Sequence, residues 1–506
     1  MFFDALKGEL PESLSVDVCI IGAGVAGITI AKQLKNEGLR IALVESGGLQ
    51  LNPDVQDLYN GENIGLPYDP LDACRLRFFG GTSNHWGGWT RPMDRVDFEK
   101  REWIPWSGWP ITLDDVAPYY EQAQNLVEVD GTPYDAEFFS PESSTNYLVD
   151  RANIETKIFK LSPPTRFLKS YKVDFNDAHS VVVLLNSNVV DFVLSESGKT
   201  VQAAQIKTLA GKNTAVTATH FVLACGGIEN ARILLNCRKA NKSGLGNDDD
   251  LVGRFFSDHD GILSGNAVLG QRLLKSTFYQ LHVPEIVRKA GLNTRIVPAF
   301  TLAEKILREK SLPNFNTYVL PVPDNAKAKG SLSIYPDIEG LVNFVEGTPL
   351  HPAGSRRFFQ LVTAFENTPN PNSRVMLGDK RDALGLLRCK LNWQRSDNDE
   401  ILARRLTMEF SRQFALAGLG RVNIDKDNIW PQKSLEIGRH HMGTTRMSSS
   451  PKHGVVDKNC RVHTTNNLFV AGSSVFASYG FAQPTLTIIA LALRLSSHIK
   501  QQVSRA

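Results

Sequence analysis

The chain has 506 residues, a length that predicts two to four domains. Hydrophobic residues make up 42% of it and charged residues 22%, an ordinary globular composition that excludes a disordered chain. The 56 lysines and arginines nearly balance the 53 aspartates and glutamates, which argues against nucleic-acid binding driven by bulk charge.

Sequence signals for cysteine clusters and for membrane insertion are weak. The six cysteines contain no CxxC pair, which disfavours a disulfide framework and a zinc ribbon. The first 16 residues do not resemble a secretory signal, and no apolar run reaches about 18 residues. We therefore expect no membrane span and a cytoplasmic location.

The first readable unit ends in an acid and contains a glycine turn. Gly22-x-Gly24-x-x-Gly27 permits a tight turn and lets a pyrophosphate approach the start of a helix. Glu45 lies 18 residues after Gly27, and its carboxylate can accept hydrogen bonds from both ribose hydroxyls. A 2′-phosphate would be repelled there, so FAD or NAD is favoured over NADP. The expected elements are a strand over 16–21, a helix over 28–36 and a strand over 40–44.

The rest of the chain predicts a nucleotide-binding α/β domain in pieces, with a second domain inserted. Residues 50–110 are rich in Gly, Pro, Trp and Asp, which indicates an irregular connection. Further strands are expected over 181–193, 218–224 and 467–471, and helices over 400–419 and 485–500.

Four later clusters combine glycines with polar side chains. Residues 79–89 (FGGTSNHWGGW) allow backbone to pass close to a flat ligand, and offer Thr, Ser and Asn as hydrogen-bonding groups. Residues 471–474 (AGSS) follow a buried strand, a place where backbone can meet a phosphate. The other two clusters are 440–447 (HHMGTTRM) and 480–487 (GFAQPTLT).

With the strings at 223–232, 371–375 and 454–457, these clusters occur in the order found in glucose-methanol-choline (GMC) flavin oxidoreductases. The chain resembles that family over nearly its whole length, and most closely its branch of pyranose oxidases and bacterial sugar and polyol oxidoreductases. The resemblance implies an α/β (α+β overall) fold. A discontinuous Rossmann-like FAD-binding domain would hold an inserted substrate domain with a mostly antiparallel sheet. The expected ranges are 1–110, 175–260 and 435–506 for the FAD domain, and 111–174 and 261–434 for the substrate domain.

The resemblance also implies which residues contact FAD. In pyranose oxidase the histidine that corresponds to His85 carries a covalent bond to the flavin. Such a bond is possible here, but we favour a non-covalent contact. The implied cofactor-binding residues are Gly22, Gly24, Gly27, Glu45, Gly81, Thr82, Asn84, His85, Val189, Ala224, Gly472, Ser473, Pro484 and Thr485.

His440 falls on the position of the family's catalytic base, which takes the hydroxyl proton while a hydride passes to flavin N5. Gln483 replaces the usual His or Asn partner and extends the amide by about 1.5 Å. It could work in a reshaped pocket, serve a different substrate or weaken activity. We interpret His441 as a supporting residue; the alternative, a metal site with His453 or His463, lacks compact ligand spacing. The Asp258-His259-Asp260 string is assigned a packing role.

The implied activity is FAD-dependent oxidation of a CH–OH group in a sugar, glycoside or other polyhydroxylated or bulky alcohol. The electrons would pass to O₂ or to a separate acceptor, so oxidase and dehydrogenase both stay open. Two alternatives also stay open: an FAD-containing lyase on the same scaffold, and a catalytically weak flavin-binding subunit.

Overall fold

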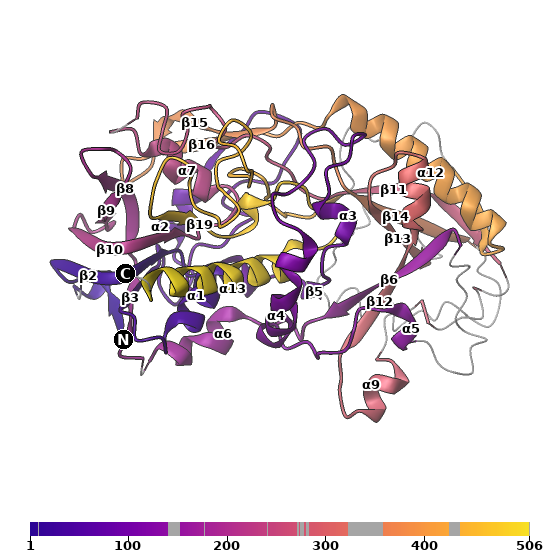
Figure 1. Ribbon diagram of the computed structural model, residues 1–506, viewed down its shortest axis with the longest axis horizontal. Coiled ribbons are helices and arrows are strands. Elements are labelled where there is room, and N and C mark those ends of the chain that lie inside the picture. Colours follow the sequence, from indigo (N-terminus) through magenta and orange to yellow (C-terminus); the bar gives the residue numbers. More distant parts are fainter. Residues whose placement is uncertain are drawn as a thin grey trace.

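The computed structural model describes residues 1–8, 10–139, 152–176, 178–239, 241–270, 273, 278–279, 283–321, 358–424 and 436–504. The chain forms two lobes, and both termini lie in the lobe that contains β2, β3 and β10 (Figure 1). We call them the parallel lobe and the antiparallel lobe, after the sheet at the centre of each.

The parallel lobe is built on an eight-stranded sheet of order β1-β7-β3-β2-β10-β9-β8, with β19 beside β10. β8 and β9 add an antiparallel edge to a parallel core, as is common in doubly wound folds. The core strands are continuous apolar runs because both faces of the sheet are covered. The strands are β1 (Phe2–Asp4), β2 (Ser13–Ile21), β3 (Ile41–Val44), β7 (Val181–Leu185), β8 (Asn188–Leu194), β9 (Val201–Lys207), β10 (Asn213–Leu223) and β19 (Leu468–Val470).

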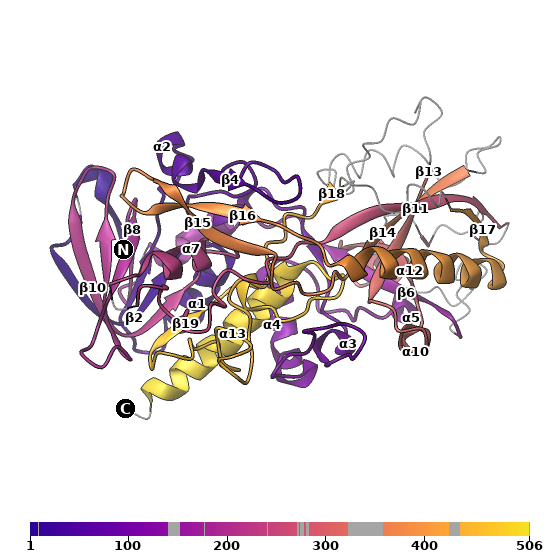
Figure 2. The ribbon, with the colours of Figure 1, turned by 90° about the horizontal axis from the view of Figure 1, so that it is seen from above.

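Two helices of this lobe have their N-terminal residues at the cavity described below. α1 (Val25–Leu34) starts directly after Gly24, within the glycine turn, and packs against α13 (Pro484–Val503). Pro484 suits the first turn of α13, where a backbone N–H has no partner within the helix. In Figures 1 and 2, α13 runs from the C-terminus toward the antiparallel lobe. The other helices of this lobe are α4 (Tyr120–Leu126), α6 (Phe167–Tyr171) and α7 (Glu229–Asn236).

The antiparallel lobe holds a second sheet of order β17-β11-β14-β13-β12-β6-β5, with β18 beside β11. Each described pair of neighbouring strands in it is antiparallel. The strands are β5 (Trp89–Thr90), β6 (Ile154–Leu161), β11 (Asp260–Leu269), β12 (Arg295–Leu302), β13 (Phe315–Pro321), β14 (Phe358–Phe365), β17 (Gly420–Asn423) and β18 (Glu436–Ile437).

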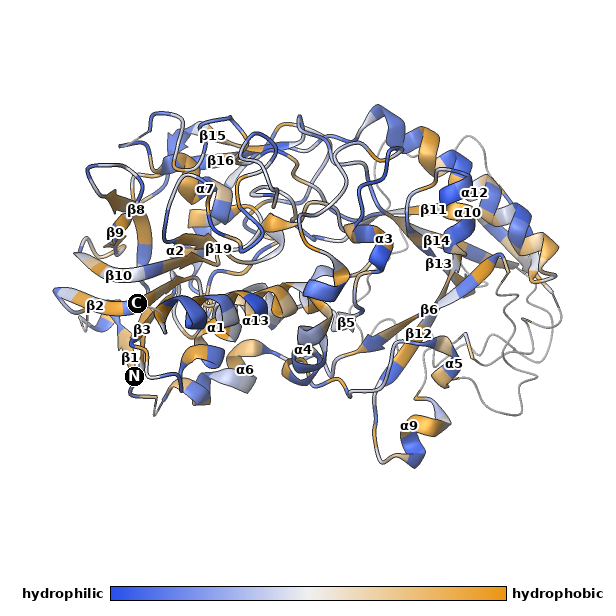
Figure 3. Cartoon of the chain, viewed as in Figure 1, coloured by the Kyte–Doolittle hydropathy of each residue, from blue (hydrophilic) through white to orange (hydrophobic). Residues whose placement is uncertain are grey.

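α12 (Asp397–Leu416) packs on this second sheet. Its apolar positions Leu406, Phe410 and Phe414 recur at helical spacing and join the core of the lobe. Figure 3 shows the resulting alternation of apolar and polar residues along the helix. The sequence predicted a helix that begins at residue 400. The helix begins three residues earlier, at Asp397, because Ser396 and Asp399 form a capping box.

Smaller elements complete the fold. A third sheet joins β15 (Arg374–Arg381), β16 (Leu387–Asn392) and β4 (Gly61–Asn63). The short helices are α2 (Pro53–Gln56), α3 (Arg95–Phe98), α5 (Ala136–Phe139), α9 (Glu285–Lys289) and α10 (Glu304–Glu309). Among the described helices, none combines the length and apolar character that a membrane crossing requires.

The predicted fold class is confirmed: a Rossmann-like α/β part in discontinuous pieces carries an inserted, antiparallel-sheet part. One predicted element is wrong, because 181–193 forms two strands, separated by a turn at Asn186 with a φ of 53°.

Residues of 111–129 and 374–393 were assigned to the inserted domain, yet they contribute to the apolar core of the parallel lobe. α4 packs on α13 there, and β15 packs on α7. The predicted boundary at 434/435 lies outside the described residues.

Candidate active site

A cavity of about 920 Å³ is lined by residues of both lobes. Its volume is near the upper end of the usual range for ligand pockets, about 300–1,000 Å³. Gly27 and Asn84 do not line it, although the sequence analysis placed both at the cofactor. The predicted site residues that do line it are Gly22, Gly24, Glu45, Gly81, Thr82, His85, Val189, Ala224, His440, His441, Gly472, Ser473, Gln483, Pro484 and Thr485.

The surroundings of the glycine turn explain why it contains three glycines. Gly22 has a φ of 101°, and a Cβ there would lie 2.7 Å from the carbonyl oxygen of Ala224, which directly follows the neighbouring strand β10. A Cβ on Gly27 would lie 1.9 Å from the carbonyl oxygen of Gly22, so Gly27 lets α1 cross the turn closely. A Cβ on Gly24 would meet no atom within 4 Å, because this residue faces the cavity. The start of α1 is thus open to a ligand, while the other two glycines serve packing.

Asn84 has a structural role in the second glycine-rich loop. Its side-chain amide donates a hydrogen bond to the Phe79 carbonyl at 2.9 Å, within its own loop. His85, the next residue, lines the cavity. Burial lowers the pKa of His85, and the positive charges of Arg439 and Arg166 lower it further, so its imidazole is neutral at pH 7.

Glu45 lies at the end of β3 and fastens the glycine turn. Its carboxylate accepts the backbone N–H of Ala23 at 2.8 Å and of Gly47 at 2.9 Å. Burial raises its pKa, and these two hydrogen bonds oppose the shift. Each carboxylate oxygen has a second lone pair, so the arrangement remains compatible with ribose hydroxyls as additional donors.

His440 lies three residues after the end of β18, is partly exposed and lines the cavity. Its Nδ1 lies 2.8 Å from Nδ1 of His259, whose Nε2 is 3.0 Å from the carbonyl oxygen of Gly480. Lost solvation holds the pKa of His440 well below 6.5, and the neighbouring His259 and His441 lower it further. His440 is therefore a neutral imidazole at pH 7, as a general base must be before it accepts a proton.

The sequence analysis missed the role of His259. This side chain is only 1% exposed, and burial lowers its pKa to about 4. The neighbouring Asp258 accepts the backbone N–H of His440 at 2.8 Å and of His259 at 2.7 Å, so one carboxylate holds both backbones. The Asp-His-Asp string was visible in the sequence, but nothing local in it indicated contact with a histidine 181 residues away.

Gln483 lies at the N-terminus of α13 and lines the cavity. The side chain is 4% exposed, and its Oε1 has no hydrogen-bond partner among the described residues. A buried amide oxygen without a donor is costly, by about 1–3 kcal/mol. Because Gln483 lines the cavity, this buried oxygen is a candidate acceptor for a hydroxyl of a bound ligand.

His441 packs mainly against protein side chains. Its ring lies 5.9 Å from that of Phe256 and 5.8 Å from that of Tyr68, and its Nε2 is 3.7 Å from the sulfur of Cys74. Burial lowers its pKa to about 3. Within the described ranges, no three His, Cys, Asp or Glu residues are grouped as a metal site would require.

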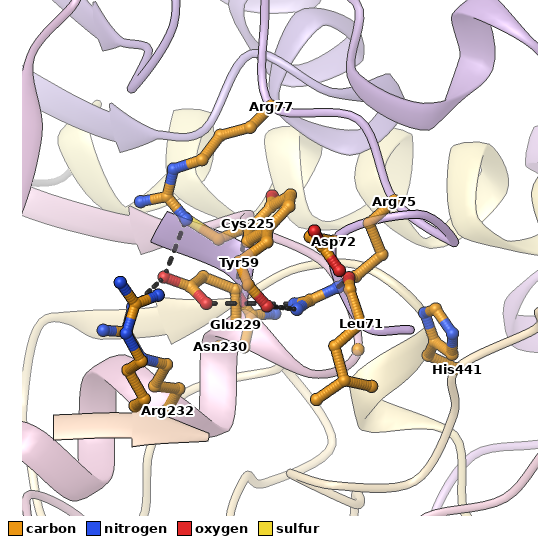
Figure 4. Close-up of polar contacts among 12 residues, drawn as sticks. Tyr59, Leu71, Asp72, Arg75, Arg77, Cys225, Glu229, Asn230, Arg232 and His441 are labelled. Atoms are coloured by element: carbon orange, nitrogen blue, oxygen red, sulfur yellow. Dashed lines mark hydrogen bonds and ion pairs between the residues drawn. The ribbon is translucent and has the colours of Figure 1, made fainter. Parts of the chain in front are cut away.

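A cluster of buried charges lies beside the cavity (Figure 4). Glu229 pairs with Arg77 at 3.0 Å, with Arg232 at 2.8 Å and with Arg75 at 3.9 Å. Burial opposes ionisation of Glu229, but the three arginines outweigh it and hold its pKa at about 2. Arg232 also pairs with Asp382. The cluster ties the segment before the second glycine-rich loop to the start of α7.

Comparison with known proteins finds a likeness to one enzyme family. The sequence model of the GMC oxidoreductases matches residues 369–492. A 2-methyl-1,2-propanediol dehydrogenase from Mycolicibacterium austroafricanum is 24% identical, with 96% of each chain covered. The large subunit of a fructose dehydrogenase from Gluconobacter japonicus is also 24% identical, over 96% of this chain and 98% of that one. Residues 369–492 thus match the GMC oxidoreductase family, and the likeness to the two relatives extends over nearly the whole chain.

The fold of the chain matches solved structures. A formate oxidase superposes with a TM-score of 0.59 and 16% identity, over 98% of this chain and all of the other. FAD is the cofactor of the family, and the enzyme is an FAD oxidoreductase that acts on alcohols. The residues present fit FAD, because the open side of Gly24 leaves room for a pyrophosphate at the start of α1.

Proposed function

We propose that this enzyme oxidises a CH–OH group of a sugar, glycoside or other polyhydroxylated or bulky alcohol. The observation that carries the proposal is that His440 and Gln483 line the same cavity as the glycine turn. Two relatives that match nearly the whole chain are named for a diol and for a sugar, which supports a polyhydroxylated substrate.

In this proposal His440 is the catalytic base. Its lowered pKa keeps the imidazole neutral at pH 7, so it can accept the hydroxyl proton of the substrate. Gln483 lines the same cavity, and its buried amide oxygen, which has no partner among the described residues, accepts a hydrogen bond from a hydroxyl of the substrate. Its longer side chain thus takes the place of the His or Asn expected beside the base.

The cofactor-binding residues position the reaction. Bound FAD supplies the acceptor for the hydride that leaves the substrate carbon. Glu45, Gly24 and the loop over 79–89 would hold FAD in the cavity, with His85 in non-covalent contact. The reduced enzyme then passes its electrons to O₂ or to a separate acceptor.

Anaerobic mixing of the purified holoenzyme with sugars, glycosides and polyols tests this function. We expect one class to bleach the flavin absorbance, and the His440→Ala variant to be reduced at least about 10²-fold more slowly. His179→Ala is the matched control, because His179 is exposed and outside the cavity. Unchanged reduction in His440→Ala would remove this residue from its role.

The alternatives give different results in the same experiment. An FAD-containing lyase would turn over its substrate without bleaching the flavin, and a weak flavin-binding subunit would show neither. Re-admission of air to the bleached enzyme distinguishes an oxidase, which recovers its colour within turnover time, from a dehydrogenase, which needs an added acceptor.

A further inference from the structure

The contact between His440 and His259 is created by strand pairing. β18 pairs antiparallel with the start of β11, through Ile437 opposite Asp260. His440 follows the one strand and His259 precedes the other, so both side chains reach the same end of the sheet. The third member, Gly480, comes from the segment before α13. Three distant parts of the chain thus meet in one row of hydrogen bonds.

The chemistry of this row determines where each proton lies. The Gly480 carbonyl can only accept, so Nε2 of His259 must carry the hydrogen of the 3.0 Å contact. A neutral imidazole has one N–H, and His259 is neutral at pH 7 because burial lowers its pKa to about 4. Its Nδ1 is therefore an acceptor, and the hydrogen of the 2.8 Å contact must belong to Nδ1 of His440. Nε2 of neutral His440 then carries a lone pair.

We propose that His259 is a positioning residue: it accepts the Nδ1–H of His440 and thereby holds the base in the tautomer whose Nε2 can take the substrate proton. The inference rests on the proposed role of His440 as the base. Sequence patterns assigned His259 only to packing, and the usual partner position of the family is occupied here by Gln483 instead.

His259 also stabilises the product of the proton transfer. One proton leaves the substrate oxygen and binds Nε2 of His440, which becomes an imidazolium. Its Nδ1–H still donates to His259, and a hydrogen bond from a charged donor is roughly twice as strong as a neutral one. His259 itself neither gains nor loses a proton. In serine proteases, a carboxylate orients the base in a similar way, and a substitution that favours the wrong tautomer lowers turnover about 10⁴-fold.

Two substitutions separate this role from simple packing. In His259→Asn, the amide oxygen lies near the place of Nδ1 and can still accept from His440. In His259→Gln, the longer amide reaches the place of Nε2 and can still donate to Gly480, but the acceptor for His440 is lost. We expect flavin reduction within about 10-fold of wild type in the Asn variant and about 10²–10⁴-fold slower in the Gln variant, with similar substrate KM. Equal rates, or a slower Asn variant, would overturn the proposal.

A second measurement does not depend on turnover. In holoenzyme with ¹⁵N-labelled histidine, protonated and bare ring nitrogens have well-separated ¹⁵N shifts, and His440→Ala assigns the signals of His440. We expect a protonated Nδ1 and a bare Nε2 on His440; the opposite tautomer would refute the inference even if no tested alcohol reduces the flavin. Failure of the proposed function would instead appear as a wild-type enzyme that no alcohol bleaches, with the predicted tautomer present.

A third variant applies if the His259 substitutions lose FAD. A Cβ on Gly438 would lie 2.7 Å from Nδ1 of His440, so Gly438→Ala displaces the imidazole from His259 while both histidines remain. We expect flavin reduction at least about 10-fold slower than in wild type. A wild-type rate would contradict the proposal.

Discussion

Replacing Gly24 by valine tests whether the start of α1 holds the pyrophosphate of FAD. A Cβ at this position meets no atom within 4 Å, and the backbone is extended with a φ of −83°, which valine adopts readily. The flavin-free protein should therefore fold normally, with an unfolding free energy within about 0.5 kcal/mol of wild type. The added side chain projects into the cavity, where it blocks approach to the backbone N–H groups of the turn.

The loss of affinity follows from the hydrogen bonds removed. A hydrogen bond to a charged group contributes about 1.5–3 kcal/mol, so loss of two to the pyrophosphate costs about 3–6 kcal/mol. This corresponds to about 10²–10⁴-fold weaker FAD binding. The assay is titration of flavin-free protein with FAD, followed by flavin absorbance per chain after desalting.

The matched control for this experiment is Gly131→Val. Gly131 is exposed, has no positive φ and also shows no atom within 4 Å of an added Cβ, but it lies far from the turn in sequence and outside the cavity lining. It should bind FAD as wild type does. A Gly24→Val protein that retains a full complement of FAD would refute the placement of the pyrophosphate at α1.

Three further predictions follow from buried groups. Glu229→Gln should lower the free energy of unfolding in urea by about 3–5 kcal/mol, because three arginines lose their shared carboxylate. The control Glu62→Gln, in a partly exposed pair with Lys390, should change it by less than about 1 kcal/mol, and equal effects would contradict the assignment. Gln483→Leu should raise the substrate KM or slow flavin reduction by about 10-fold or more while FAD content stays constant, and an unchanged enzyme would show that the amide does not touch substrate. The free energy of unfolding should fall below about pH 6.5, because His441 and His259 bind protons in the unfolded chain but not in the folded one, where their pKa values are about 3 and 4. Each histidine contributes up to about 1.4 kcal/mol per pH unit, so the slope of this free energy against pH, measured by urea titration, should be shallower in His441→Phe. A wild-type stability that does not change with pH would refute this.

The local signals in the sequence were sufficient for the first structural unit. The pattern strand, Gly22-x-Gly24-x-x-Gly27, helix, strand and Glu45 lies within about 30 residues, and each part depends on neighbours in the chain. The structure shows β2, α1 and β3 in that order, with boundaries shifted by one to three residues. Such shifts are expected because periodicity indicates an element better than its ends.

Residue roles were harder to predict where one motif contains both packing and ligand-facing positions. Gly27 and Asn84 belong to glycine-rich strings that line the cavity, yet one packs α1 against its turn and the other closes its own loop. Backbone conformation, which residue type alone does not specify, decides which side chains of a string face the cavity.

The sequence by itself predicted the family, FAD as the cofactor and His440 as candidate base, because these predictions depend on short motifs whose glycine and histidine positions have a chemical reason. Only the tertiary structure decided what surrounds them. His259 meets His440 because β11 and β18 pair, and Glu229 collects Arg75, Arg77 and Arg232 from two segments. Contacts between residues 150 or more positions apart depend on how whole sheets and helices pack, and no local periodicity records that packing.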